Sequence, residues 1–175
     1  RHRDTNGMTG SASPTKLVCL GAGGHAKVVL EALRTSFAGE IVALLDADES
    51  RRGQVVGGVT IAGGDGELAG LAAAGADAFI VTVGMVGNAA PRRKLFALGL
   101  SSGLVPVSAI HATAIVSPSV VIGAGVAILA GAIVNTSATL GDNVIINTGA
   151  IVEHDCRIGD HAHIATGARL SGDVT

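Results

Sequence analysis

The sequence predicts an α/β domain followed by a β-solenoid, and two observations support this fold class. Residues 16–108 alternate between strand-like and helix-like segments, which is typical of a Rossmann-like parallel sheet covered by helices. From Ile110 to Leu170 an aliphatic residue returns every six positions without a break. Such a period is typical of hexapeptide repeats, in which three short strands form one coil of about eighteen residues. We therefore expect two domains, at residues 16–108 and 109–175.

The first segments of the chain predict a β-α-β unit around a glycine-rich loop. Lys16–Leu20 is an apolar strand, residues 21–26 form the loop, and a helix follows. A second strand, Glu40–Leu45, ends at Asp46. The loop has the pattern G-x-G-x-x-A, which in dinucleotide-binding proteins places a phosphate at a helix N-terminus, while an acidic residue after the second strand bonds the ribose. A tight turn that only packs the helix on the strand is the alternative.

The remainder of this domain adds a strand and two helices. We expect helices at 65–74 and 88–98, the second capped by Asn88, and a strand at 77–83. Ligands bind at the carboxyl ends of parallel strands, where loops 21–25, 46–48 and 84–88 meet. His25 is expected either to donate to a ligand oxygen or to cap its helix. The pair Arg51 and Arg52 is expected to be solvated, or else to meet phosphates.

The repeat predicts which side chains fill the solenoid. The six-residue frame supplies large inward aliphatic residues, and a second frame four positions later supplies small ones such as Ala132 and Cys156. Three glycines, Gly123, Gly141 and Gly159, lie eighteen positions apart and are expected to need a positive φ at one corner of successive coils.

Composition excludes several classes of function. The net charge is −2, and there are three Phe with no Trp or Tyr, so neither charge nor stacking surfaces favour nucleic-acid binding. No apolar run approaches the roughly 18 residues of a membrane span. Residues 1–15 lack the hydrophobic centre of a signal peptide and are expected to be a disordered or artificially added leader. We expect a soluble, cytoplasmic protein without a membrane partner.

His154 is the strongest catalytic candidate in the solenoid. It lies outside the inward frames and between two acids, Glu153 and Asp155. Imidazole suits proton transfer near neutral pH, and a carboxylate bonded to one ring nitrogen raises the basicity of the other. A metal site with His161 and His163 is the alternative, but His154 and His163 are half a coil apart, so we expect no metal.

Taken together, these motifs resemble a known family. The segment Gly21-Ala22-Gly23-Gly24-His25, the corner Leu45-Asp46-Ala47-Asp48, Gly84 with Asn88 and Arg92, and the repeats with Asn147-Thr148 and Glu153-His154-Asp155 carry the resemblance. They are similar to the sialic acid O-acetyltransferase family, which includes bacterial acetyltransferases of nucleotide-linked 4-amino sugars. The resemblance runs from about Lys16 to the last residue.

The resemblance implies a fold and an assembly. It implies a Rossmann-like nucleotide-sugar-binding domain followed by a left-handed parallel β-helix, assembled as a homotrimer with acetyl-CoA between neighbouring β-helices. Because related proteins continue for several more coils, we expect the β-helix domain to be truncated after Thr175.

The resemblance also implies roles for individual residues. His154 would be the general base and Asp155 would orient it. His163 and Gly172 would contact acetyl-CoA. The substrate would be bound by a third group of residues, namely Gly23, Gly24, His25, Asp46, Asp48 and Asn147.

The expected activity is transfer of an acetyl group from acetyl-CoA, the co-substrate, to the amine of a UDP- or GDP-linked amino sugar, in polysaccharide or glycan biosynthesis. Three alternatives remain at this stage. One is O-acetylation of a hydroxyl, as on sialic acid. Another is a truncated, non-catalytic nucleotide-sugar-binding protein, and the third is a nicotinamide-dependent oxidoreductase built on the glycine loop.

Overall fold

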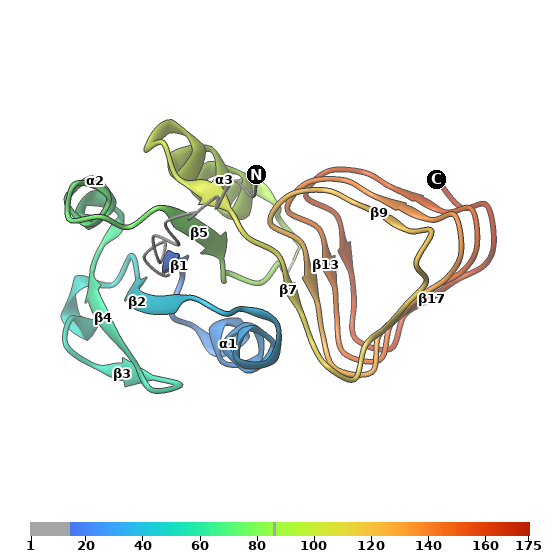
Figure 1. Cartoon of the computed structure of the whole chain (residues 1–175), viewed down its shortest axis with the longest axis horizontal. Coiled ribbons are helices and arrows are strands. Elements are labelled where there is room, and N and C mark those ends of the chain that lie inside the picture. Colours follow the sequence, from blue (N-terminus) through green and yellow to red (C-terminus); the bar gives the residue numbers. More distant parts are fainter. Residues whose placement is uncertain (1–14, 86) are drawn as a thin grey trace, which may run out of the picture.

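The computed structural model describes residues 15–85 and 87–175, so the expected leader lies outside the described residues except for Thr15. Figure 1 shows an α/β domain beside a triangular solenoid. In the first domain the elements follow in the order β1 Lys16–Leu20, α1 Gly24–Ser36, β2 Glu40–Leu45, η1 Glu49–Arg51, β3 Val55–Val56, β4 Val59–Gly63, η2 Asp65–Glu67, α2 Leu68–Ala73, β5 Ala78–Val81, α3 Ala90–Ser101 and β6 Val105–Pro106.

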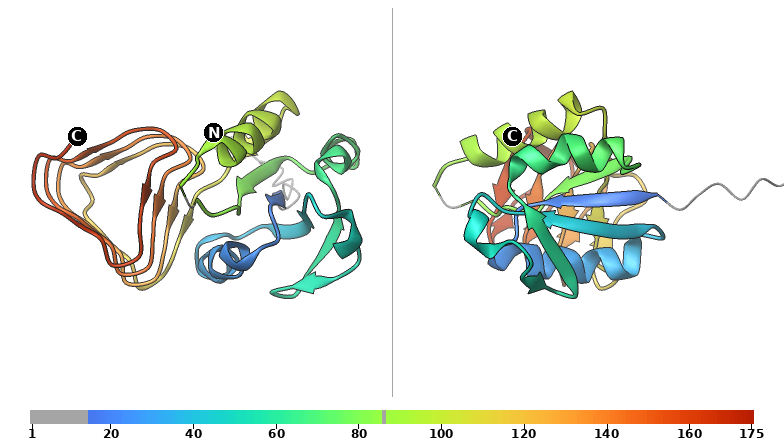
Figure 2. Two further views of the ribbon diagram at one scale, coloured as in Figure 1. Left: turned by 180° about the vertical axis from the view of Figure 1, so that it is seen from behind. Right: turned by 90° about the vertical axis from the view of Figure 1, so that its left-hand side faces the viewer.

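The six strands form one sheet in the order β3-β4-β2-β1-β5-β6. All neighbouring strands are parallel except β3, which pairs antiparallel with β4. Strands β1, β2 and β5 were predicted, but the β3–β4 hairpin was not, because β3 has only two residues and two glycines, Gly57 and Gly58, form the turn that follows it. Helix α1 covers one face of the sheet, and α2 and α3 cover the other (Figure 2).

The helices lie on the sheet because strand residues alternate between two cores. Leu17 and Cys19 of β1 face α1, whereas Val18 and Leu20 face α2 and α3, and all four are fully buried. The core under α1 continues into the solenoid through Ala109, Ala127 and Leu129. The two domains therefore pack together through this cluster, while the interior of the solenoid forms a separate hydrophobic core.

The solenoid has three parallel sheets, one for each side of the triangle (Figure 1). Its two-residue strands are β7 Ala109–Ile110, β8 Ile115–Val116, β9 Val121–Ile122, β10 Ala127–Ile128, β11 Ile133–Val134, β12 Thr139–Leu140, β13 Ile145–Ile146, β14 Ile151–Val152, β15 Arg157–Ile158, β16 His163–Ile164 and β17 Arg169–Leu170. Each strand ends on a residue of the six-residue frame and pairs with the strand eighteen residues away. Both predicted inward frames fill the interior.

The corner glycines were expected to need a positive φ, and this prediction was wrong. Gly123, Gly141 and Gly159 do not have a positive φ. A Cβ on Gly123 would lie 2.6 Å from the carbonyl carbon of Gly141 in the next coil, and a Cβ on Gly141 would lie 2.7 Å from the backbone nitrogen of Asp160. Close stacking of coils therefore excludes a side chain at these two positions. The positive φ falls two residues later, at Gly125, Asn143 and His161.

Within the described residues, no helix is long and apolar enough to cross a bilayer.

Candidate functional site

A pocket of about 440 Å³ opens at the carboxyl ends of β1, β2 and β5. The glycine loop, including Gly23, Gly24 and His25, forms one side, and Asp46 lies at the end of β2. The opposite wall comes from Thr82, Val83 and Gly84 after β5 and from the start of α3. The structure thus brings together four of the predicted substrate-binding residues, from segments that the β-α-β pattern placed at one edge of the sheet.

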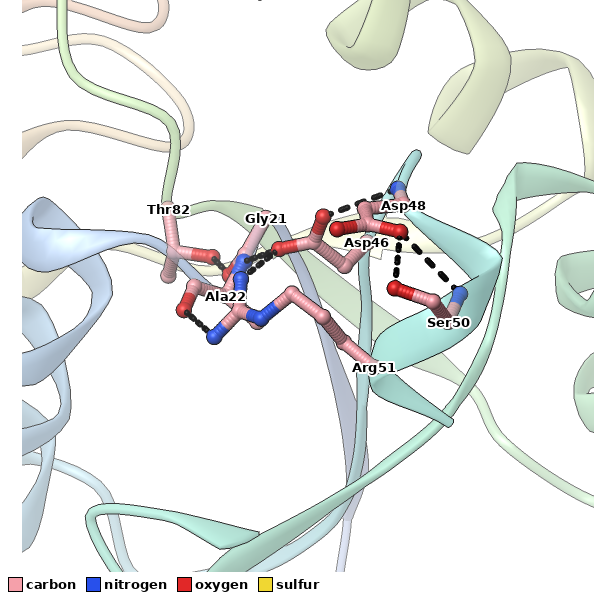
Figure 3. Close-up of polar contacts among 7 residues, drawn as sticks. All are labelled: Gly21, Ala22, Asp46, Asp48, Ser50, Arg51 and Thr82. Atoms are coloured by element: carbon pink, nitrogen blue, oxygen red, sulfur yellow. Dashed lines mark hydrogen bonds and ion pairs between the residues drawn. The ribbon is translucent and has the colours of Figure 1, made fainter. Parts of the chain in front are cut away.

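Asp46 is held by the glycine loop itself (Figure 3). One carboxylate oxygen accepts the backbone N–H of Ala22 at 3.2 Å and the guanidinium of Arg51, while the other accepts the N–H of Asp48 at 3.0 Å. Arg51 also donates to the carbonyl of Ala22 at 3.0 Å. The Arg51 side chain is 27% exposed and bonded to two pocket residues, Asp46 and Ala22, so it is not a fully solvated surface arginine. Arg52, in contrast, is half exposed and pairs with Glu49 and Glu67.

Asp48 has a local structural role. Its carboxylate accepts the backbone N–H of Ser50 at 3.0 Å and the Ser50 hydroxyl at 2.6 Å, which caps the short helix η1 (Figure 3). These hydrogen bonds lower the pKa of Asp48. Asp48 does not line the pocket, and its predicted contact with substrate stays a prediction.

Two charged pocket residues were not predicted from the sequence. Asp65 at the start of η2 and Lys94 on α3 both line the pocket. Asp65 follows the carboxyl end of β4, a strand that the sequence did not predict, and Lys94 lies within a helix. Lys94 and Pro91 are three positions apart on α3, so they lie on the same face of the helix, and both line the pocket. This helical spacing is the one sequence feature that could have indicated Lys94.

His25 is a half-buried, neutral histidine of the pocket. Burial lowers its pKa to about 4, with smaller contributions from the charges of Arg92 and His163. Its ring packs over Gly84, where an added Cβ would lie 3.2 Å from the Cβ of His25. Its buried Nε2 has no hydrogen-bond partner among the described residues. At neutral pH His25 can therefore offer one N–H or one lone pair, but no charge.

The predicted catalytic pair forms at a solenoid corner between β14 and β15. His154 Nδ1 lies 2.8 Å from Asp155 Oδ2, and the two side chains are 57% and 55% exposed. This hydrogen bond is the largest cause of a raised pKa at His154. The other flanking acid, Glu153, instead accepts the side-chain amide of Asn135 at 2.9 Å. Asp155 alone therefore fixes the imidazole with its Nδ1 bonded and its Nε2 free.

Gly172 lies against the ring of His154, one coil further along. A Cβ at this position would come within 2.6 Å of His154 Nε2 and 2.5 Å of its Cε1. The backbone N–H of Asp173 also donates to the carbonyl of His154 at 2.9 Å. Two predicted site residues that are eighteen positions apart are thus in direct contact, because coil stacking superimposes them.

His163 and Asn147 meet on the side of the solenoid that faces the first domain. The Asn147 amide donates to His163 Nε2 at 2.9 Å, and His163 Nδ1 donates to the carbonyl of Met85 at 2.9 Å. Both ring nitrogens of His163 are therefore occupied by protein groups. Among the residues described, no group of three or more His, Cys, Asp or Glu side chains is arranged to hold a metal ion.

Two family models match the chain. Residues 16–97 match the PglD N-terminal domain, and residues 137–172 match the bacterial transferase hexapeptide (six repeats) model. A comparison with curated proteins gave no match.

Solved structures decide the family. A variant of GDP-perosamine N-acetyl transferase from Caulobacter crescentus, in complex with CoA and GDP-perosamine, is 40% identical, with a TM-score of 0.82 over 92% of this chain and 74% of that one. The chain belongs to the hexapeptide-repeat family of bacterial sugar acetyltransferases. The acetyltransferase domain of PglB from Neisseria gonorrhoeae FA1090, in complex with acetyl coenzyme A, is 38% identical, with a TM-score of 0.79 over 91% and 75% of the two chains.

A more distant structure, WeeI from Acinetobacter baumannii AYE, shares the fold at 22% identity, with a TM-score of 0.70 over 89% and 72% of the two chains. These matches confirm the predicted Rossmann-like domain, left-handed β-helix and acyltransferase class. The oxidoreductase alternative is therefore wrong.

Proposed function

We propose that the chain transfers the acetyl group of acetyl-CoA to the amine of a nucleotide-linked amino sugar. The observation that carries the proposal is the presence, on one chain, of a glycine-loop pocket and of a carboxylate-bonded histidine with a free Nε2. The relatives support the substrate class, because one was crystallised with CoA and GDP-perosamine and another with acetyl coenzyme A.

In this proposal the pocket binds the nucleotide part of the acetyl acceptor, which is the nucleotide-linked amino sugar. The diphosphate lies against the N-terminus of α1 at Gly23 and Gly24, where backbone N–H groups and the helix dipole favour an anion. Asp46 accepts ribose hydroxyls with its remaining lone pairs, and His25 contacts the ligand in its neutral form. Asp48 and Asn147, which do not line the pocket, contact parts of the substrate that extend beyond it.

The chemistry is a direct acyl transfer with His154 as general base. The sugar amine attacks the thioester carbonyl, and His154 Nε2 takes a proton from the amine as the C–N bond forms. The tetrahedral intermediate collapses, the C–S bond breaks, and the CoA thiolate leaves and takes up the proton from His154. Asp155 stabilises the imidazolium, and Gly172 leaves room for the acetyl-CoA arm beside the ring. The proposed contact of His163 with acetyl-CoA would lie on the β16 side of the solenoid and would be a packing contact, because protein groups occupy both of its ring nitrogens.

The site needs two chains in this proposal, because the pocket and His154 lie on opposite sides of the solenoid. The β13 side of the triangle faces the first domain, whereas the corner between the β17 and β9 sheets points away from it (Figure 1). One side of about six residues spans up to ~20 Å. The outer face of β8, β11 and β14 carries Ile115, which is 64% exposed, above Ile133 and Ile151. We propose that this apolar stripe packs in a homotrimer.

A substrate panel tests the reaction. Release of CoA from acetyl-CoA is followed with GDP- and UDP-linked 4-amino sugars and with sialic acid. We expect turnover with a nucleotide amino sugar and a product that carries an amide. Turnover only with sialic acid would contradict N-acetylation and support transfer to a hydroxyl. The predicted cytoplasmic location and a role in glycan biosynthesis stay predictions.

Coexpression of two inactive variants tests the shared site. One chain carries His154→Ala, and the other carries Gly24→Trp, which fills the pocket. If pocket and base come from different chains, mixed trimers contain intact sites and recover a measurable fraction of the wild-type activity. Activity no higher than that of the separate variants would mean that each chain supplies both parts.

A further inference from the structure

Arg92 is a buried cation without an acidic partner. It is 1% exposed, and none of the salt bridges among residues 15–85 and 87–175 involves it. Burial lowers its pKa to about 10, so the guanidinium remains charged at neutral pH. An unpaired charge inside a protein costs free energy. The surroundings of Arg92 show what offsets this cost.

The guanidinium of Arg92 joins the pocket wall to the β-helix. Its Nη1 donates to the carbonyls of Val81 and Val83, at 2.9 and 2.7 Å, and its Nε donates to the carbonyl of Asn143 at 3.1 Å. Val83 lines the pocket, and Asn143 is a corner residue of the solenoid. Four residues along α3, Phe96 packs beside the same corner, against His161. Arg92 thus fixes the end of β5 relative to the second domain.

The charge of Arg92 also acts on the pocket. It contributes to the lowered pKa of His25, a pocket residue, and its buried Nη2 has no hydrogen-bond partner among the described residues. Lys94, two positions further on the same helix, lines the pocket directly. Of the two pocket carboxylates, Asp46 is paired with Arg51, which leaves Asp65 as the acid that opposes these charges.

We propose that Arg92 is a positioning residue for the nucleotide sugar: it holds the Val81–Val83 wall against Asn143, and its uncompensated buried charge favours a diphosphate in the pocket without contacting it. The inference rests on the proposed function, because that function places a nucleotide in the pocket. The two effects of Arg92 are separable. The position of the wall affects the affinity for every part of the ligand, whereas the charge affects only the affinity for its diphosphate.

Calorimetric titration of the full chain separates these effects. GDP and UDP are each compared with the uncharged nucleosides guanosine and uridine. In Arg92→Met we expect diphosphate affinity to fall about tenfold more than nucleoside affinity, which corresponds to about 1.4 kcal/mol. The matched control is Arg93→Met, which removes the same charge from an exposed neighbouring position and should change neither affinity by more than about twofold.

Arg92→Lys provides the second variant, and melting temperatures are recorded for all three. Lysine keeps the charge but cannot bridge the carbonyls of two domains. We expect a lower melting temperature than wild type with diphosphate selectivity largely retained, even if Arg92→Met fails to fold. Equal losses for diphosphates and nucleosides, or loss of diphosphate selectivity in Arg92→Lys, would overturn the electrostatic role.

Wild-type behaviour of Arg92→Met would overturn both roles. A wild-type chain that binds neither GDP nor UDP would overturn the proposed function, and with it the effect of charge on the ligand. The melting temperatures test separately whether Arg92 links the two domains. A melting temperature of Arg92→Met no lower than that of Arg93→Met would contradict this link.

Discussion

His25 and His154 are the same side chain in opposite environments. His25 is half-buried in the pocket of the first domain, and this burial lowers its pKa to about 4. His154 is 57% exposed at a corner of the β-helix, and its hydrogen bond to Asp155 raises its pKa. The first is suited to neutral contacts with a ligand, and the second to accepting a proton. In the proposed reaction, this difference places substrate binding in the first domain and proton transfer in the β-helix.

The largest expected effect is at His154. Replacement with Ala should lower kcat by about 10² to 10⁴-fold, because the general base is lost. The KM for the nucleotide sugar and the melting temperature should stay within experimental error of wild type, because the side chain is exposed and distant from the pocket. Steady-state kinetics and thermal unfolding check this. Near-normal turnover would mean that a group other than His154 is the general base.

Gly172→Ala should have the next largest effect. The new methyl group would overlap the His154 ring, and a displacement of about 1 Å costs roughly 100-fold in rate. The matched control is Gly159→Ala, where a Cβ meets nothing within 4 Å. We expect kcat to fall only in the first variant, as measured by CoA release. Equal behaviour of the two variants would show that the contact with His154 has no bearing on turnover.

Gly24→Ala addresses the pocket side. A Cβ at this position meets no protein atom within 4 Å, so the fold tolerates it, but the methyl group occupies the space in which a phosphate would approach the helix N-terminus. We expect about tenfold weaker binding of the nucleotide sugar, with an unchanged melting temperature and unchanged kcat at saturation. Calorimetry measures the affinity, and steady-state kinetics measure kcat. A fall in kcat with unaltered affinity would contradict a role of Gly24 in binding.

The smallest effect is a shift in the pH profile. The base must be neutral to act, so kcat should rise with pH through the pKa of His154, with a limb above pH 6.5, because Asp155 raises that pKa. Asp155→Asn removes this cause, and the limb should move to lower pH while the plateau rate falls. His25, with a pKa of about 4, should add no limb near neutrality. A limb that stays in place in Asp155→Asn would mean that another group controls the rate.

Sequence by itself determined the features that depend on local pattern. The six-residue frame gave the inward residues of every coil, since each coil repeats the same geometry. The β-α-β pattern placed Gly23, Gly24, His25 and Asp46 at one sheet edge, because parallel strands end there. His154 and Asp155 are adjacent in the chain, so their pairing was also predictable.

Only the tertiary structure decided the contacts between coils and between domains. Gly172 meets His154 because coils stack, and Arg92 meets Asn143, 51 positions away, because α3 packs on a corner of the solenoid. The same stacking, rather than a positive φ, requires glycine at Gly123 and Gly141. The repeat specifies which way a side chain points, but the atoms that it touches depend on how separately folded surfaces come together, and no local spacing encodes that docking.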